Sequence, residues 1–144
     1  MIANVWLESP RERLKIWRNF RNELLNIDDE EEVLQAVVDW WKSAPINSRV
    51  IDPYDNTDWP NPWDLLHTGD YDENVITLGM AYTLELIDWS CEIKLIQDKN
   101  KSEVKLIILV DDEYILNYTY GIINKLADIS HCDILKSWDT EQLT

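Results

Sequence analysis

The chain has 144 residues, 28 of them acidic and 13 basic, so its formal net charge at pH 7 is −15. This length suits one domain whose core needs no disulfide or metal, and we expect a single domain over residues 1–144. The charge argues against direct binding to nucleic acid or an anionic membrane, because phosphate contacts need Lys and Arg, and it would attract a basic protein.

The chain shows no signal for secretion or membrane insertion. The N-terminal residues lack the basic and apolar regions of a signal peptide, and no apolar run reaches the roughly 20 residues needed to span a bilayer. We therefore expect a soluble intracellular protein. Its two cysteines, Cys91 and Cys132, are then reduced thiols that serve as small core residues.

Two helices are predicted near the N-terminus. Ser9 as a cap, with Pro10 after it and an apolar stripe beyond, predicts a helix over about 10–26. The acidic run at 28–32 suits the start of a second helix, which ends near Ser43 because a proline follows. The short connection between them predicts an antiparallel pair.

A long irregular stretch then precedes a short helix. Residues 45–61 show neither helical nor strand periodicity, and loops of this length are usually functional or packed down by their own side chains. Asn61 as a cap and Pro62 at the first helical position begin a short helix, which Thr68-Gly69 ends.

The segment 72–87 is the predicted core helix. Its apolar residues leave no broad polar face, and a helix that is apolar nearly all round is normally surrounded by protein. Asp72 can cap its start, while Gly79 and Ala81 allow a neighbouring element to approach the backbone closely.

After Ile87 the apolar period changes from 3.6 to 2, which predicts strands. We expect an antiparallel meander of three or four strands, formed by 91–95, 104–110, 114–118 and 122–123. The tail from 128 to 144 is predicted to fold back as a short strand or helix, frayed after Trp138. This order predicts an α+β fold with a helical part at about 9–87, strands at about 91–126 and a tail at 127–144.

No motif in the sequence assigns catalytic, cofactor-binding or metal-binding residues. The histidines, His67 and His131, lie far apart in the sequence, and no short paired spacing joins them to Cys91 or Cys132 in a zinc pattern. The aspartates of the irregular stretch lack the spacing of an EF-hand loop. We therefore expect no catalytic residue, no cofactor and no metal.

The order of a buried helix followed by antiparallel strands resembles the core of transglutaminase-like and papain-like cysteine enzymes. The resemblance implies a nucleophilic Cys at the helix N-terminus, where the dipole lowers its pKa, and a His and an Asp on the strands. Here the helix begins Tyr71-Asp72-Glu73 without a Cys, and residues 91–123 contain no His. A fold of that type would be catalytically empty.

The segments Trp59-Pro60-Asn61-Pro62-Trp63 and Leu78-Gly79-Met80-Ala81-Tyr82 resemble small acidic proteins of unknown function from large contractile-tailed bacteriophages. The resemblance spans most of the chain, including Tyr114-Ile115-Leu116-Asn117-Tyr118. Those proteins tend to carry a Cys where this chain has Asp72. The resemblance implies a phage setting, in the host cytoplasm or within the virion, and no activity.

Residues 28–90 hold two basic and fifteen acidic side chains, a net charge of −13. Our leading hypothesis is therefore a non-catalytic interaction protein, a phage particle or assembly component or an accessory factor, that binds a basic protein. The predicted partner-binding residues are Tyr54, Trp59 and Trp63 for contact and Asp52, Asp55 and Asp58 for steering. The alternatives are an acidic inhibitor that mimics nucleic acid or acts as an immunity protein, and a degenerate transglutaminase-like fold.

Overall fold

A computed structural model describes residues 4–46, 50–69 and 71–143 of the chain. Its α-helices are α1 (Pro10–Leu24), α2 (Glu30–Lys42), α3 (Pro62–Thr68) and α4 (Glu73–Glu85). The short 3-10 helix η1 (Val5–Leu7) precedes α1, and η2 (Asn56–Asp58) lies between α2 and α3. The four predicted helices are confirmed, with ends close to those expected. None of the helices described is long and apolar enough to cross a membrane.

Local side-chain chemistry fixes where each α-helix begins. The residue before each helix accepts a hydrogen bond from the backbone N–H three positions later; these capping residues are Ser9, Asp29, Asn61 and Asp72. Pro10 and Pro62 occupy first helical positions, where a missing N–H costs nothing. The acidic run at 28–32 therefore has a structural role at the start of α2.

The strands form one antiparallel sheet in the order β4-β3-β2-β1-β5. Their bounds are β1 (Cys91–Asp98), β2 (Glu103–Val110), β3 (Tyr114–Leu116), β4 (Asn124–Lys125) and β5 (Cys132–Asp139), with η3 (Leu126–Ile129) and η4 (Thr140–Gln142) on either side of β5. The α+β fold is confirmed: helices fill the first part of the chain and the sheet fills the second.

The structure of the tail differs from two of our expectations. It forms β5, an edge strand paired with β1, so the sheet has five strands and not three or four. The chain is also not frayed after Trp138, because Thr140 is buried and its hydroxyl donates to the Cys91 carbonyl oxygen at 3.1 Å. A third difference is smaller: the strand expected at 122–123 lies two residues later in the sequence, at Asn124–Lys125.

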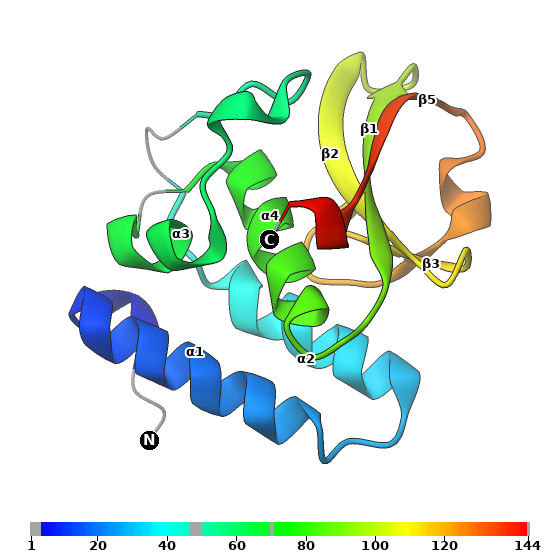
Figure 1. Cartoon of the computed structure of the whole chain (residues 1–144). Helices are drawn as coiled ribbons and strands as arrows, with labels where there is room; N and C mark the ends of the chain where they lie inside the picture. The colour runs from blue at the N-terminus through cyan, green and yellow to red at the C-terminus, as the bar shows by residue number, and fades with distance from the viewer. Residues whose placement is uncertain (1–3, 47–49, 70, 144) are drawn as a thin grey trace.

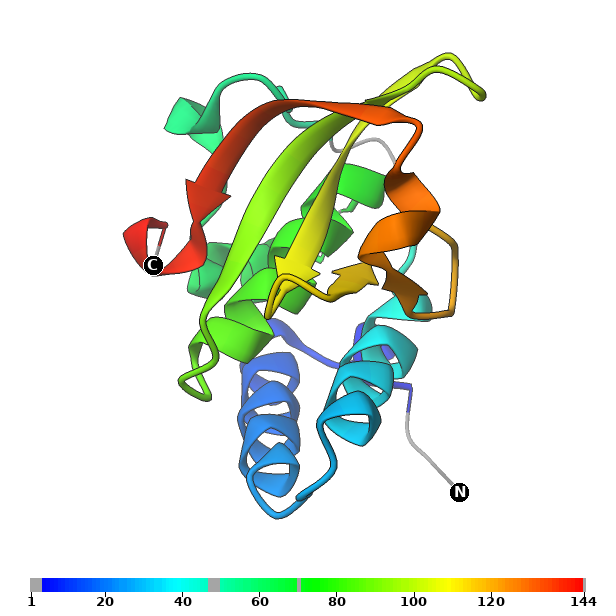
Figure 2. The same ribbon diagram turned by 90° about the vertical axis from the view of Figure 1, so that its right-hand side faces the viewer.

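Helix α4 forms the middle layer of the molecule (Figures 1 and 2). One side of α4 packs on β1 and β2, and the other helices lie beyond it. Every residue from Val75 to Leu84 is buried, which confirms α4 as the core helix. On the opposite face of the sheet, η3 covers a smaller apolar cluster that includes Ile96, Ile107 and Tyr118.

A single hydroxyl group joins α1, α2 and α4 in the core. The Thr83 hydroxyl oxygen accepts hydrogen bonds from the indole N–H groups of Trp17 and Trp41, both at 3.0 Å, and donates to the Gly79 carbonyl oxygen at 2.7 Å. Gly79 lies under the Trp41 ring, where a Cβ atom would come within 2.5 Å of the ring. The predicted close approach at Gly79 is therefore made by a tryptophan of α2.

We expect Thr83→Val to destabilise the protein by about 2–5 kcal/mol, because each buried N–H left without an acceptor costs about 1–3 kcal/mol. Thr83→Ser is the matched control: it loses a methyl group and keeps the hydroxyl, so its cost should be near 1 kcal/mol. Urea unfolding followed by tryptophan fluorescence measures both. Equal destabilisation of the two variants would contradict the role of the hydroxyl.

The start of α2 also contacts the end of the sheet. The Tyr114 hydroxyl donates to Glu31 at 3.1 Å, and Glu30 lies against Asp111 in the turn between β2 and β3. A side-chain hydrogen bond with Asp111, together with partial burial, raises the pKa of Glu30 from 4.5 to about 7. The folded protein therefore binds a proton at Glu30 that the unfolded chain releases at lower pH.

Because its folded-state pKa is raised, Glu30 contributes stability below about pH 4.5 that is lost as the pH rises to about 7. We expect Glu30→Gln, which stays neutral, to gain stability relative to the wild type across this interval. Thermal unfolding at a series of pH values measures the difference curve. Glu32→Gln removes one charge from the same helical turn and is the control. Parallel curves for the wild type and Glu30→Gln would refute the assignment.

Candidate functional site

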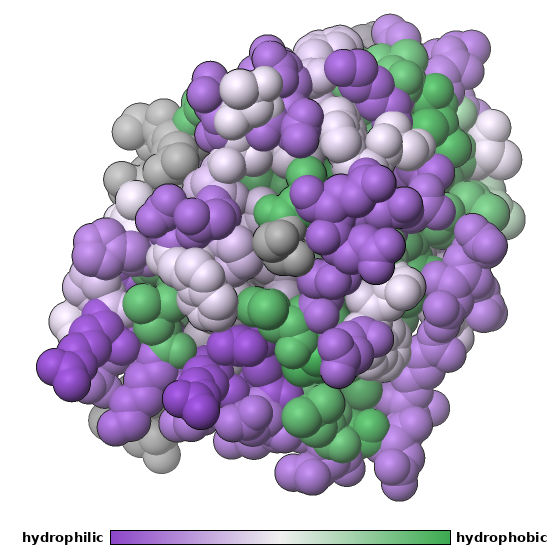
Figure 3. Space-filling view, in the orientation of Figure 1, coloured by the Kyte–Doolittle hydropathy of each residue, from purple (hydrophilic) through white to green (hydrophobic). Residues whose placement is uncertain are grey.

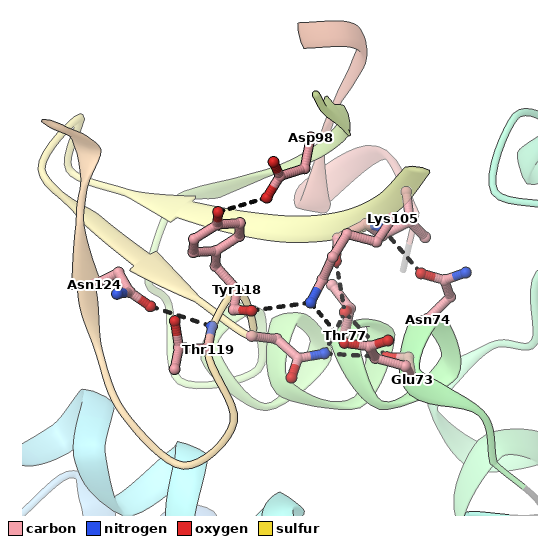
Figure 4. Close-up of polar contacts among 10 residues, drawn as sticks. Glu73, Asn74, Thr77, Asp98, Lys105, Tyr118, Thr119 and Asn124 are labelled. Atoms are coloured by element: carbon pink, nitrogen blue, oxygen red, sulfur yellow. Dashed lines mark hydrogen bonds and ion pairs between the residues drawn. The ribbon is translucent and has the colours of Figure 1, made fainter. Parts of the chain in front are cut away.

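The N-terminus of α4 meets an uncovered part of β2, and we take this junction as the candidate site. Strand β3 pairs only with Ile108–Val110, so the backbone of Leu106 has no partner strand on that side. Two side chains of α4 fill this place (Figure 4): the Asn74 carbonyl oxygen accepts from the Leu106 N–H at 3.0 Å, and the Thr77 hydroxyl bonds to the Leu106 carbonyl oxygen at 3.0 Å.

A buried lysine completes the junction. Lys105 is 5% exposed, and its ammonium group donates to the Glu73 carboxylate at 2.6 Å and to the Tyr118 carbonyl oxygen at 3.0 Å. From the turn after β3, the Asn117 side chain donates to the Glu73 carbonyl oxygen at 3.1 Å and to the Thr77 hydroxyl at 2.7 Å. Asn117 has φ 64°, a conformation that Asn tolerates better than most residues.

A cavity of about 380 Å³ opens beside this junction. Its lining residues are Lys42, Ala44, Ile46, Glu73, Ile76, Met80, Asn117, Tyr120 and Gly121. Polar groups of Glu73 and Asn117 lie at one part of a wall that is otherwise largely apolar, the usual composition of a ligand pocket. The cavity therefore reaches the first turn of α4 through Glu73.

Hydrogen bonds and the ion pair between Glu73 and Lys105 hold the junction together. Asp72, Glu73 and Asn74 occupy the first positions of α4, so no thiol stands there. Cys91 lies near the opposite end of α4, where the Thr140 hydroxyl oxygen is 3.4 Å from its sulfur and 3.0 Å from the Glu85 carboxylate. Burial raises the pKa of Cys91 to about 11. Cys91 is a protonated core thiol at neutral pH, as expected for a small core residue.

The second cysteine lies on the other face of the sheet. Cys132 is half-buried and belongs, with Asp98 and His131, to a group whose metal-binding atoms lie within 4.8 Å of one another. Burial, followed by the nearby Asp98 carboxylate, raises the pKa of Cys132. Strand pairing therefore brings together side chains that the sequence spacing did not connect, on the face of the sheet away from α4.

The predicted partner-binding aromatic residues occupy different places. Tyr54 is 48% and Trp63 is 51% exposed. Trp59 is half-buried: its ring lies 4.7 Å from that of Trp138, and its indole N–H donates to the Asp52 carbonyl oxygen at 2.8 Å. Trp63 packs instead against Trp17 of α1. Trp59 therefore anchors the irregular stretch, while Tyr54 and Trp63 present ring surface to solvent.

The predicted steering aspartates are all exposed. Two of them also hold the local backbone: Asp52 accepts from the Tyr54 N–H at 2.9 Å, and Asp55 caps η2 through Thr57. The hydrogen bonds from Thr57 lower the pKa of Asp55. Residues 47–49 of this predicted loop lie outside the described part of the chain.

Sequence reasoning missed the residues that meet at the α4 junction. One signal was present, since Lys105 interrupts an otherwise apolar strand from Val104 to Val110. A lone charge within a buried strand requires a specific partner. Asn117 carried no such local signal, because its role depends on a positive φ and on a helix distant in the sequence.

Comparisons with known proteins support the fold. No protein-family model matches the sequence, and no curated protein matches significantly. Solved structures of Legionella pneumophila LapG do match. One LapG structure has a TM-score of 0.70 at 15% identity, over 90% of this chain and 75% of LapG. A calcium-bound LapG structure has a TM-score of 0.72 at 13% identity, over 91% and 76%. At this identity the likeness establishes a shared fold.

We expect both thiols to react slowly. At neutral pH, iodoacetamide should label Cys91 at least about tenfold more slowly than free cysteine, because burial excludes the reagent and the raised pKa leaves little thiolate. Cys132 should also react more slowly than free cysteine. Intact-mass measurements on Cys91→Ser and Cys132→Ser assign the rates. A thiol that outpaces free cysteine would show an activated nucleophile.

Proposed function

We propose that this chain is a non-catalytic binding protein built on a transglutaminase-like scaffold. One observation carries the proposal. At the N-terminus of α4, Glu73 forms an ion pair with Lys105, and Asp72 caps the helix. In the cysteine enzymes that this order of elements resembles, a thiolate stands at that helix end and an imidazole faces it from a strand. Neither group is a thiol or an imidazole, so the cysteine–histidine chemistry of those enzymes has no counterpart at this helix end.

Other features of the molecule support a binding function. The cavity beside the junction has a largely apolar wall with polar groups at one part. Over the face seen in Figure 3, polar side chains predominate and apolar ones form separate patches. The excess negative charge of residues 28–90 would attract a basic protein partner and speed the encounter.

We place the partner contact on the irregular stretch before α3. Trp59 and the hydrogen bond from Lys136 to the Tyr54 carbonyl oxygen, at 2.6 Å, fasten this stretch to β5. The fastened backbone offers the exposed Tyr54 ring next to carboxylates, and such preorganisation lowers the entropic cost of binding. Trp63, on the adjoining helix α3, extends the proposed contact.

The geometry gives less support to a nucleic-acid mimic. That alternative requires rows of carboxylates at phosphate-like spacing. The acidic residues of this region instead begin different helices, with Asp29 at α2, Asp55 at η2 and Asp72 at α4. A phage particle, assembly or accessory protein acting in the host cytoplasm remains our proposal for the setting.

Affinity capture tests the proposed contact. We expect immobilised protein to retain a basic partner from phage-infected cells at low salt and to lose most of it at high salt, because exposed charges are screened. Changing Asp52, Asp55 and Asp58 together to Asn should weaken retention. The control changes Glu12, Glu23 and Glu141 to Gln, which removes the same charge from exposed residues elsewhere.

Mass spectrometry of the captured material measures both effects. Retention that is insensitive to salt, or that falls equally in the two triple variants, would contradict a contact at the irregular stretch. Equal loss would mean that overall charge alone attracts the partner.

A further inference from the structure

Asp98, His131 and Cys132 meet where two strands pair, on the sheet face opposite α4. Asp98 is the last residue of β1, Cys132 is the first residue of β5, and the two are register partners. His131 precedes Cys132 in the chain. The three residues contribute a carboxylate, an imidazole and a thiol, all within 4.8 Å of one another.

The Asp98 carboxylate is buried and held in a fixed orientation. Its side chain is fully buried; one oxygen accepts from the Tyr118 hydroxyl at 2.6 Å, and the other accepts from the backbone N–H groups of Asn100 and Lys101. Figure 4 shows the Tyr118 ring reaching across to this carboxylate. Carboxylates and imidazoles fixed by surrounding hydrogen bonds in this way are typical of metal ligands.

Asp98 carries a buried negative charge without a permanent cation in contact. Its ion-pair partner among the described residues is His131, whose Nε2 lies 3.2 Å from Oδ1 and which is charged only when protonated. The Lys101 ammonium group lies instead over the Tyr118 ring, 4.6 Å from its centre. A bound cation would add a full positive charge beside this buried carboxylate, which is otherwise held by hydrogen bonds from neutral groups.

One pair of donor atoms has the spacing of two ligands on a small tetrahedral ion. Two nitrogen or oxygen ligands about 2.0–2.1 Å from zinc are about 3.3 Å apart at a tetrahedral angle, close to the 3.2 Å between His131 Nε2 and Asp98 Oδ1. The His131 side chain is 31% exposed, so an ion could enter from solvent and a water could complete its coordination. Thiolate and imidazole ligands favour zinc over calcium or magnesium.

We infer that Asp98, His131 and Cys132 form a binding site for zinc or a similar transition-metal ion. This site lies outside the α4 junction and is independent of the proposed partner binding. A bound ion would tie the first residue of β5 to the last residue of β1. It would therefore stabilise the edge strand that the tail of the chain forms.

Cobalt(II) titration of the full-length reduced protein tests the assignment. A site with the Cys132 thiolate should give visible ligand-field bands of tetrahedral intensity and a near-ultraviolet thiolate-to-cobalt charge-transfer band. Zinc should displace the cobalt and abolish both. Cys132→Ser should remove the charge-transfer band, whereas Cys91→Ser, which changes the other buried thiol, should keep it.

Affinity and stability provide a second readout. Competition titration should show zinc binding weakened at least about tenfold in Cys132→Ser and in His131→Gln, and unchanged in His67→Gln. Zinc should raise the unfolding temperature of the wild type and of Cys91→Ser, because it binds the folded state. Circular dichroism checks that each variant is folded.

Three results would overturn the site: no cobalt spectrum in the wild type, a charge-transfer band that survives in Cys132→Ser, or equal zinc affinity in wild type and His131→Gln. Any of them would leave the cluster as a hydrogen-bonded group around Asp98. Because neither cobalt nor zinc binding involves Tyr54 or the steering aspartates, failure here would not bear on the proposed partner contact.

Discussion

The fold depends on one oxygen atom in its centre. The Thr83 hydroxyl accepts the indole N–H groups of Trp17 and Trp41, two residues with no exposed surface that come from different helices. Burying an indole is favourable only when its N–H finds an acceptor. Gly79, one turn before Thr83, removes the side chain that would keep the Trp41 ring away. Glycine and threonine four residues apart thus set where α1 and α2 pack on α4.

This constraint explains why α4 can serve as a rigid base for the sheet edge. With one side fixed by two tryptophans, its first turn is presented to β2 at the place where β3 has ended. Asn74 and Thr77 then take the backbone groups of Leu106 that a longer β3 would have bonded. The sheet therefore continues into the helix through side chains, and unpaired edge groups, which invite association with other chains, are covered here.

Much of the fold followed from local sequence, because helix caps and apolar periods act over a few residues. Ser9, Asn61 and Asp72 could be placed as caps with their spacing alone. Strand β5 could not be placed, since most of its residues are exposed and it lacks the apolar alternation of a half-buried strand. Non-local pairing also created the groupings on which our proposals rest: Lys105 with Glu73, and Asp98 with His131 and Cys132, each join segments that carry no common motif.

The two groupings are connected by Tyr118. The Tyr118 carbonyl oxygen accepts from Lys105 on the α4 side, and its hydroxyl donates to Asp98 on the other. Lys105 thus anchors the turn after β3 as well as neutralising Glu73. An imidazole in its place could not reach as far or carry a permanent charge. The ion pair that occupies the helix end is for this reason part of what holds the sheet edge together.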